Sequence, residues 1–322
     1  MKITVIGGSS YIGENLLKEL SFNRKLEVSS ISRNIPSNHK KIDFVNYISI
    51  DILNDFNSLK EHLNTAKIVI NLIGELNNEA MMKKTNFLFL KQLVDYIINS
   101  DLNLHLIQVS SVGVYGAKNN KNREIKLINE ESYLNPNNLY EKTKRDADEY
   151  ILKRFNSRNK SSYLILRPTI IVGKAMKSSV LRKIMWLVKN KLFIYFGYNN
   201  FFNFLHIKDF NYAIILCIER INEIKNKIYI ISNDCKQTDF IKKVALVCKV
   251  KSPKISINIK IILFFYNLFS KFRINLPINL GQLQFLNSRV LFSNKKITND
   301  LGFYPSHSLD NELIIKDLIE NL

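Results

Sequence analysis

The sequence has few cysteines and no long apolar run. Among 322 residues, the three cysteines are Cys217, Cys235 and Cys248, and their spacing matches neither a metal site nor a disulfide framework. No apolar stretch reaches the roughly 18 to 20 residues of a membrane-spanning helix. The N-terminus starts directly with a strand-like stretch and lacks the pattern of a secretory signal. These absences predict a cytoplasmic protein with reduced thiols and no metal site.

Acidic residues are also scarce relative to basic ones. Lys and Arg number 47 against 28 Asp and Glu, which gives a formal net charge of +19. Such an excess is typical of proteins that bind nucleic acid or anionic membranes. Here the lysines are scattered and no recognition motif accompanies them. We therefore expect no nucleic-acid partner, although the positive field would attract a phosphorylated substrate.

Apolar strand-like stretches alternate with helical patterns through the first half of the chain. The stretches are residues 2–7, 26–33, 67–74, 104–112 and 162–173. Near-continuous apolar strands separated by helices indicate a parallel sheet that is covered on both faces. The sequence therefore predicts an α/β protein with a Rossmann-type doubly wound sheet.

The alternation loosens after Gly173, which suggests a second, smaller unit. We predict a main domain of residues 1–170 plus about 203–232. Residues 171–202 and 233–322 would form a smaller α/β domain, in which no regular strands are expected beyond about residue 239. It would lie over the carboxyl edge of the sheet, where ligands bind in open α/β folds.

The first strand leads into the turn GGSSYIG, residues 7–13. Gly7, Ser10 and Gly13 hold the three key positions of a G-x-x-G-x-x-G frame. Such a turn brings the backbone close to a pyrophosphate and offers it a helix N-terminus. Ser10 stands where a glycine is expected, and its hydroxyl is a candidate phosphate donor. Strand–glycine–helix turns also occur without cofactors, so the turn alone does not identify a cofactor site.

A stronger signal comes from the spacing of Tyr140 and Lys144 in LYEKTK. Four residues apart, they share one face of a helix. An ammonium beside a phenol stabilises the phenolate and lowers the pKa of Tyr140 toward neutrality, as proton transfer requires. Ser110 and Ser111 end a predicted strand at the ligand edge. These residues predict an acid/base site with a nearby hydroxyl.

Together these segments resemble the extended short-chain dehydrogenase/reductase superfamily, and within it the NAD(P)-dependent nucleotide-sugar epimerases, dehydratases and reductases. The resemblance is carried by VIGGSSYIG, INLIG, SSVGVYG, YEKTK, LRPTIIVG, NFLHIKD and DLGFYP. It implies that Tyr140 is the catalytic acid/base and that Lys144 holds the nicotinamide ribose. Ser111 would hydrogen-bond the reacting sugar oxygen, with Ser110 as the alternative.

The resemblance also implies a set of cofactor-binding residues, with the main domain binding NAD(P) and the smaller one the substrate. Asp51 and Ile52 would flank the adenine, whereas His206 and Asp209 match a segment that is mainly structural. The full cofactor set is Gly7, Ser9, Ser10, Tyr11, Ile12, Gly13, Arg33, Asp51, Ile52, Leu72, Asn86, Tyr140 and Lys144.

Two departures from the family pattern narrow the prediction. NAD-preferring members usually end the second strand with an acidic residue, whereas this chain has Ser32 and Arg33. An arginine pairs well with a 2′-phosphate, so NADP(H) is favoured, with NAD(H) as the alternative. Ile170 stands where sugar-nucleotide epimerases often have an asparagine that contacts the diphosphate, which argues against a standard UDP-sugar site.

The first functional prediction is an NAD(P)H-dependent reductase of a nucleotide-activated 4-keto-6-deoxyhexose, in the synthesis of bacterial surface polysaccharide such as the O-antigen of lipopolysaccharide. The alternative is an NAD-dependent 4-epimerase of a nucleotide- or polyprenyl-diphosphate-linked hexose. A non-catalytic dinucleotide-binding protein is a third alternative, which the intact Ser111–Tyr140–Lys144 set disfavours.

The sequence raises two further questions about partners. The resemblance implies a homodimer that forms through a helix pair including the helix of Tyr140. Residues 258–273 are apolar and flanked by basic residues. We expect them to form a buried helix. The alternative is an interfacial helix that makes a peripheral contact with an anionic membrane.

Overall fold

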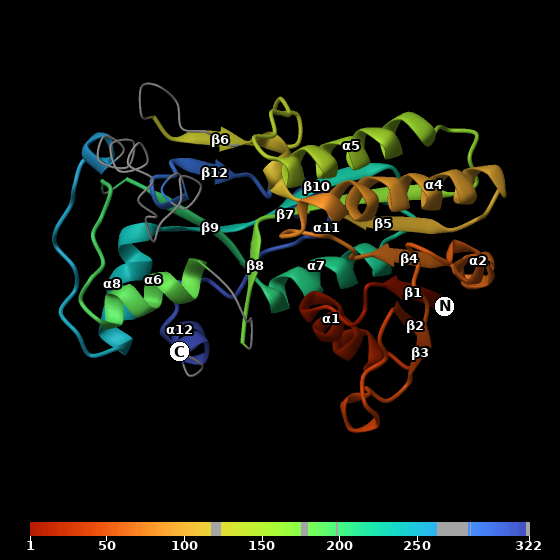
Figure 1. Cartoon of the computed structure of the whole chain (residues 1–322), viewed down its shortest axis with the longest axis horizontal. Helices are drawn as coiled ribbons and strands as arrows, with labels where there is room; N and C mark the ends of the chain where they lie inside the picture. The colour runs from red at the N-terminus through yellow and green to blue at the C-terminus, as the bar shows by residue number, and fades with distance from the viewer. Residues whose placement is uncertain (117–123, 175–179, 198, 263–282, 284, 320–322) are drawn as a thin grey trace.

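The computed structural model describes residues 1–116, 124–174, 180–197, 199–262, 283 and 285–319. Its main sheet has seven parallel strands in the order β10-β7-β5-β4-β1-β2-β3 (Figure 1). The strand order reverses at β1 and β4, as in a doubly wound Rossmann-type sheet. The predicted fold class is therefore confirmed. The strands are β1 (Lys2–Ile6), β2 (Glu27–Ser32), β3 (Val45–Ser49), β4 (Ile68–Asn71), β5 (His105–Val109), β7 (Ser162–Pro168) and β10 (Lys227–Ile231).

Helices cover both faces of this sheet. One face packs against α1 (Tyr11–Ser21) and α7 (Ile207–Glu219). The other packs against α2 (Phe56–Thr65), α4 (Phe89–Asn99) and α5 (Leu139–Arg154). Every residue of β4, β5 and β7 is buried, which explains why these strands are mostly apolar and show no alternation of buried and exposed positions.

A smaller unit lies at the opposite end of the molecule from α2, at the left of Figure 1. Its sheet has the order β11-β9-β8, and it has a separate apolar core that includes Phe202, Phe204 and Phe240. The strands are β8 (Ile170–Val172), β9 (Phe201–His206) and β11 (Asn233–Lys236), and the helices are α6 (Val180–Lys189), α8 (Gln237–Val247) and α12 (Glu312–Ile319).

The chain crosses between the two sheets within the stretch 162–173, which was predicted as one strand. β7 ends at Pro168, which has no N–H for a ladder, and β8 starts at Ile170 in the smaller sheet. β9 also belongs to that smaller sheet, whereas α7 and β10 return to the main unit. The segment of about 203–232 was predicted to belong to the main domain. It contains most of β9, which pairs in the smaller sheet instead.

Short elements not foreseen from the sequence complete the fold. β6 (Lys126–Ile128) pairs in parallel with β12 (Val290–Phe292), and β12 lies in the tail beyond residue 239 that was expected to lack regular strands. The remaining elements are η1 (Asn38–Lys40), α3 (Glu79–Met82), the π-helical η2 (Lys83–Leu88), η3 (Val112–Tyr115) and α11 (Lys295–Leu301).

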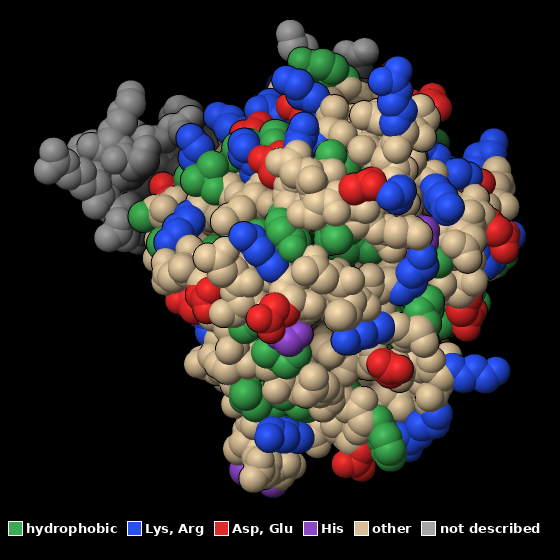
Figure 2. All heavy atoms as spheres, turned by 90° about the vertical axis from the view of Figure 1, so that its right-hand side faces the viewer, with side chains coloured by type: hydrophobic (Ala, Val, Ile, Leu, Met, Phe, Trp, Pro, Cys, Tyr) green, Lys and Arg blue, Asp and Glu red, His purple; other side chains and the backbone are tan. Residues whose placement is uncertain are grey.

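The predictions about membrane contact fall largely on residues that the structure does not describe. Of the apolar segment 258–273, all but residues 258–262 lie outside the described ranges. Within those ranges, no helix is both long and apolar enough to cross a bilayer. On the face shown in Figure 2, Lys and Arg side chains are interspersed with Asp and Glu rather than gathered into one tract.

Candidate active site

The turn between β1 and α1 depends on close contacts that only glycine permits. Gly7 has a φ of +89°, in the left-handed region that favours glycine. A Cβ on Gly13 would lie 2.5 Å from the Gly7 carbonyl oxygen, and one on Gly8 would lie 2.1 Å from Ser30 Oγ. Because these positions carry no side chain, the backbone of the loop can pack directly on α1.

Ser10 closes this turn as the N-cap of α1. Its Oγ accepts a hydrogen bond from Gly13 N at 3.0 Å and donates one to Gly7 O at 2.8 Å. The expected phosphate donor therefore already uses its single proton inside the loop. Binding of an anion is left to the first-turn amides of Tyr11 and Ile12, for which an α-helix has no internal partner.

A pocket of about 430 Å³ begins at this loop and continues past the carboxyl ends of β2, β3 and β4. This is the edge at which open α/β sheets bind ligands. Tyr11, Ile12 and Gly13 lie in α1 next to it. Of the predicted cofactor residues, the pocket is lined by Gly7, Ser9, Ser10, Arg33, Asp51, Ile52 and Leu72.

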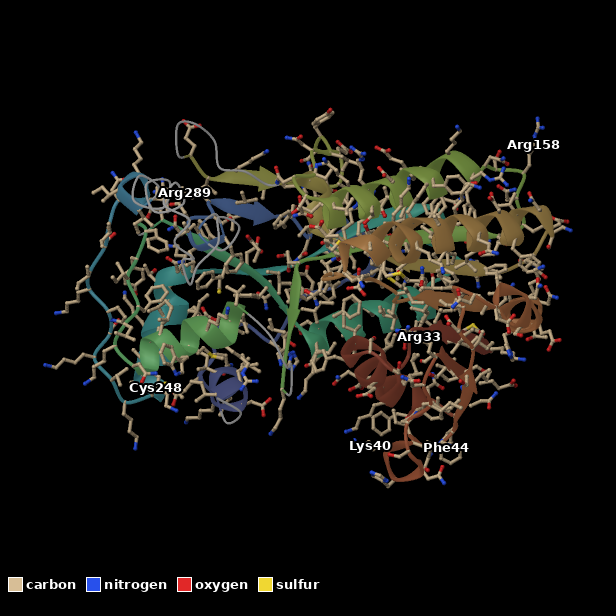
Figure 3. All side chains as sticks on the ribbon, in the orientation of Figure 1. Arg33, Lys40, Phe44, Arg158, Cys248 and Arg289 are labelled. Atoms are coloured by element: carbon tan, nitrogen blue, oxygen red, sulfur yellow. The ribbon has the colours of Figure 1, made fainter. Side chains whose placement is uncertain are left out.

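Arg33 is the cationic side chain at the far end of this pocket. It is exposed and follows Ser32, whose Oγ accepts a hydrogen bond from Ser9 N at 3.0 Å. Figure 3 shows Arg33 in the region of α1 and β1, with Lys40 farther out in the loop between β2 and β3. Ser32 therefore ties the end of β2 to the glycine turn and leaves Arg33 facing the ligand space.

An acidic side chain, Glu75, lines the same pocket. The backbone amides of Asn78 and Asn77 lower the pKa of its carboxyl, and the charge of Arg33 lowers it further. Asp51 is held by hydrogen bonds from Leu53 N at 3.3 Å and Asn54 Nδ2 at 2.8 Å. The pocket thus carries charges of both signs at fixed places.

Asn86 lies beside the pocket rather than in its wall. It belongs to the π-helical η2 and is 2% exposed. Its Oδ1 accepts from Glu75 N at 2.7 Å, and its Nδ2 donates to Glu75 O and to Thr143 Oγ1, each at 3.0 Å. Asn86 therefore ties the loop after β4 to α5 next to Lys144, and its direct contact with a cofactor stays a prediction.

Ser111 and Tyr140 come together where β5 ends and α5 begins. Ser111 caps η3 through a hydrogen bond from Gly113 N to its Oγ at 3.0 Å. Tyr140 lies in the first turn of α5, which Asn138 caps by accepting from Glu141 N at 2.9 Å. The Ser111 hydroxyl is near enough to the Tyr140 hydroxyl to act on it as a hydrogen-bonding neighbour that lowers its pKa. The structure thus brings together the two hydroxyls that the sequence singled out.

Lys144 lies one turn beyond Tyr140 and is only 3% exposed. Its Nζ donates to Ile73 O at 3.2 Å and to Val109 O at 3.1 Å. Since an ammonium has three N–H donors, one is left for a ligand. Gly74 makes this close approach possible, because a Cβ there would lie 3.3 Å from Nζ. Burial lowers the pKa of Lys144 to about 8, against the opposing effect of Asp148.

The pKa of Tyr140 differs from the sequence-based prediction. Burial raises it to about 12, and the hydrogen bond with Ser111 is what lowers it, whereas Glu141 and Asp148 raise it further. The expected lowering by Lys144 is not observed, because the ammonium is directed at two backbone carbonyls. In this state the raised pKa keeps the Tyr140 phenol protonated at neutral pH.

Sequence reasoning missed two buried charges beside this site, Asp148 and Arg167. Asp148 Oδ2 accepts from Arg167 Nε at 2.9 Å and from Ser110 Oγ at 2.9 Å. Ser110 is therefore engaged away from Ser111 and does not replace it. A signal was present, since Asp148 continues the four-residue spacing of Tyr140 and Lys144 along α5.

Three other predicted residues have clear places in the structure. His206 caps α7, and Asp209 accepts hydrogen bonds from Ser306 N and His307 N, each at 3.0 Å. Both are thus structural, as the family pattern implies. Ile170 starts β8 with its side chain 40% exposed, so an apolar group is presented where the pattern has an amide.

The described residues contain neither a disulfide nor a cluster of metal ligands. All three cysteines are free, and Cys217 and Cys235 are buried. Across the described ranges, no group of three or more His, Cys, Asp or Glu is placed to hold a metal ion.

The residues present fit a dinucleotide. The glycine turn has no space for a Cβ at Gly13, as expected where backbone must approach a pyrophosphate. The pocket continues from that turn to Asp51 and Ile52, and the ammonium of Lys144 lies against Gly74, which lines the same pocket. Pyrophosphate, adenine and nicotinamide ribose each have a matching part of the site.

Comparison with known proteins agrees with this geometry. The model of the NAD dependent epimerase/dehydratase family matches residues 3–232. The chain belongs to this family. Its curated relatives include the 3 beta-hydroxysteroid dehydrogenase/Delta 5-->4-isomerase of Monkeypox virus, 26% identical over 186 residues, and that of Vaccinia virus (strain Copenhagen), 26% identical over 188. These matches cover 54% of this chain and 53% of each viral protein, so the chain spans about half their length.

Solved structures of this epimerase/dehydratase type share the fold over nearly the whole chain. UDP-glucuronic acid 4-epimerase from Bacillus cereus, in complex with NAD, has a TM-score of 0.74 at 17% identity, covering 99% of this chain and 97% of its own. UDP-glucose 4-epimerase from Thermotoga maritima, with UDP-glucose, has a TM-score of 0.75 at 16% identity, covering 100% and 99%. At such identities the likeness shows the fold alone.

Proposed function

We propose that this member of the epimerase/dehydratase family transfers hydride at a secondary alcohol or ketone carbon of a nucleotide-activated sugar. The observation that carries the proposal is the juxtaposition of Ser111 and Tyr140, with Lys144 one turn away and against Gly74, in the wall of a pocket that begins at a glycine turn. Further support comes from structural relatives that are complexes with UDP-glucuronic acid or UDP-glucose and NAD.

Tyr140 would move the proton in this reaction. In the oxidising direction its phenolate takes the proton of the sugar hydroxyl as hydride leaves the same carbon. In the reducing direction its phenol gives that proton to the alkoxide oxygen as hydride arrives. Ser111 donates a hydrogen bond to the developing oxyanion, and Lys144 stabilises the phenolate. The nicotinamide, when bound, accepts or supplies the hydride.

The residues beside Ser111 favour chemistry at one carbon over loss of water. Dehydration needs a second proton transfer at a neighbouring carbon, and Ser111 is followed by Val112 and Gly113. Glu141, whose side chain lies against Gly113, accepts a hydrogen bond from Asn137 N at 2.6 Å and is thereby engaged with the loop before α5. In the described part of the chain, Tyr140 is the group we assign to proton transfer.

Two reactions use this chemistry, and we place 4-epimerisation first. In that reaction the sugar carbon is oxidised, the keto-sugar rotates, and the same hydride returns to the other face. The support is the fold shared with two 4-epimerases of UDP-sugars. Such a cycle needs a cofactor that stays bound through both hydride transfers.

The second candidate is reduction of a nucleotide-activated 4-keto-6-deoxyhexose, in synthesis of bacterial surface polysaccharide. It is favoured by Arg33, which lines the pocket without an acidic residue at the end of β2. This arrangement suits the 2′-phosphate of NADP(H), a cofactor that would be exchanged in each turnover.

The dinucleotide that co-purifies separates the two reactions. An epimerase is expected to release tightly held NAD on denaturation and to interconvert sugars without added cofactor. A reductase is expected to purify without it and to oxidise one NADPH for each 4-keto-sugar nucleotide consumed. Mass spectrometry of the released nucleotide and NADPH absorbance measure these outcomes. If the protein retains no dinucleotide and oxidises no NADPH with any such substrate, the proposal fails.

Replacing Arg33 tests the cofactor preference. We expect Arg33→Ala to weaken NADPH binding by roughly ten- to a hundredfold, because a hydrogen bond to a charged group contributes about 1.5–3 kcal/mol. NADH binding should change little. The control is Lys40→Ala in η1, farther from the pocket, which should leave both affinities unchanged. Calorimetry with both dinucleotides gives the ratio, and equal effects on the two would contradict a role for Arg33 at the 2′-phosphate.

The homodimer through the helix of Tyr140, the cytoplasmic location and the peripheral membrane contact stay predictions. α4 and α5 pack side by side on one face of the sheet. On their surfaces Asp95 pairs with Lys91 at 2.7 Å and with Arg154 at 3.0 Å. A dimer through these helices would therefore have charged as well as apolar groups at its interface.

A further inference from the structure

A continuous chain of buried contacts runs through the ion pair of Asp148 and Arg167, next to the candidate catalytic residues. Ser110 Oγ donates to Asp148 Oδ2 at 2.9 Å, and Arg167 Nε donates to the same oxygen at 2.9 Å. Arg167 NH1 donates in turn to Tyr115 Oη at 2.7 Å, and its guanidinium lies 5.0 Å from the centre of the Tyr115 ring. The chain thus joins the end of β5, η3, α5 and β7.

These groups are too deeply buried to be an ordinary surface ion pair. The side chains of Arg167 and Asp148 are 2% and 0% exposed. A buried pair of this kind is weak evidence for stability, because desolvation offsets much of the attraction. Replacement by apolar residues would commonly be tolerated, so the stability of the fold alone does not account for this arrangement.

Because Asp148 lies on the same helix as Tyr140 and Lys144, its charge also affects the protonation of these two residues. Tyr140, Lys144 and Asp148 follow at intervals of four on α5 and so share one helix face. Asp148 Oδ1 has no hydrogen-bond partner within the described residues, so part of its charge is left uncompensated. Asp148 raises the pKa of both Lys144 and Tyr140.

The same chain of contacts holds the segment that carries the Ser111 hydroxyl. Ser110 precedes Ser111, and Tyr115 ends η3, the short helix that Ser111 caps. With Ser110 bonded to Asp148 and Tyr115 bonded to Arg167, both ends of the segment 110–115 are tied to the buried pair. The segment that carries Ser111 is therefore held against α5.

We propose that the buried Asp148–Arg167 pair is a positioning device of the active site, which holds Ser111 against Tyr140 and keeps the ammonium of Lys144 charged. This inference rests on the proposed function. The other carboxylates near these residues are engaged elsewhere. Glu141 accepts a hydrogen bond from Asn137 N. Glu130, which acts on Tyr115, accepts from Ile230 N at 2.9 Å. Neither carboxylate lies on the α5 face shared by Tyr140, Lys144 and Asp148.

The test is the pH dependence of turnover in the oxidising direction. In the profile of turnover against pH, one limb reports the deprotonation of Tyr140 and Lys144. We expect Asp148→Asn to move this limb to lower pH by about one unit or more. The sign follows because loss of a negative charge favours the deprotonated forms of both groups. Asp148→Glu, which keeps the charge, should restore the limb even if kcat is reduced.

Two matched variants separate charge from packing. Tyr115→Phe and Ser110→Ala each remove one hydrogen bond of the chain and leave every charge in place. They should lower kcat more than they change KM, with the limb at its wild-type pH. A limb that moves equally in these variants, or that does not move in Asp148→Asn, overturns the charge role. Unchanged kcat in both would overturn the positioning role.

A double variant covers the case in which Asp148→Asn does not fold. Asp148→Asn combined with Arg167→Met removes both buried charges, so neither is left unpaired, and its limb should move in the same direction by a smaller amount. A limb at the wild-type pH contradicts the proposal. Difference titration of the Tyr140 phenolate, against Tyr140→Phe as blank, follows the same shift without turnover. It therefore distinguishes failure of this inference from failure of the proposed function.

Discussion

Tyr140→Phe is expected to reduce turnover by about 10²- to 10⁴-fold, the usual contribution of a positioned acid/base group. The substitution removes only the hydroxyl, so the ring still fills its place in α5 next to Ser111. Hydride transfer would then leave the oxygen of the substrate without a proton donor or acceptor. Steady-state kinetics with the sugar nucleotide identified by the co-purification experiment gives the measurement.

The control for this variant is binding. Dinucleotide affinity, measured by calorimetry, should stay close to that of the unsubstituted protein, because the glycine turn and the pocket do not involve the phenol. A variant with unchanged turnover would remove Tyr140 from the mechanism. A variant that loses both turnover and affinity would show that the phenol supports the fold of the site rather than its chemistry.

Gly13→Ala is expected to have the largest effect on cofactor binding. The added Cβ would lie 2.5 Å from Gly7 O and 2.6 Å from Gly8 Cα, and both are backbone atoms that cannot turn aside. Overpacking of this kind costs about 1–3 kcal/mol. If that cost falls on the cofactor-binding form of the turn, affinity drops by roughly five- to 150-fold.

A glycine outside the site provides the comparison. Gly302 follows α11 with a φ of +69°, and no heavy atom lies within 4 Å of the place where its Cβ would be. Gly302→Asn keeps a residue that tolerates the left-handed region and should leave dinucleotide affinity unchanged. Equal affinity in Gly13→Ala and the unsubstituted protein would show that the turn between β1 and α1 does not contact the cofactor.

The main sheet and the neighbouring positions of Ser111, Tyr140 and Lys144 could be predicted because they depend on local pattern. Strand runs such as Ile68–Asn71 are mostly apolar, and the Tyr140–Lys144 spacing fixes a shared helix face whatever the tertiary structure. Ser111 was placed from its position at a strand end. In each case the signal lies within a few residues of the feature that it predicts.

What the sequence could not show depends on distant contacts. The direction of the Lys144 ammonium is set by Ile73 O and Val109 O, which belong to the loop after β4 and to β5, so the expected lowering of the Tyr140 pKa was wrong. The proton of Ser10 is used by Gly7 O. β12 pairs with β6 from more than 150 residues away, and three-residue strands carry too little pattern to be found alone.

The crossing of the chain between its two sheets has a mechanical consequence. The covalent links from the main sheet to the smaller one run through Thr169, between β7 and β8, and through Ser232, between β10 and β11, while β9 leads back into α7. The chain crosses again near its C-terminus, since Leu286 and Leu309 pack in the smaller core whereas Ile297 and Phe303 pack in the main one. Two units that are tied at several places along the chain resist twisting against each other. We therefore expect them to move as one body to a greater extent than two domains joined by a single linker would.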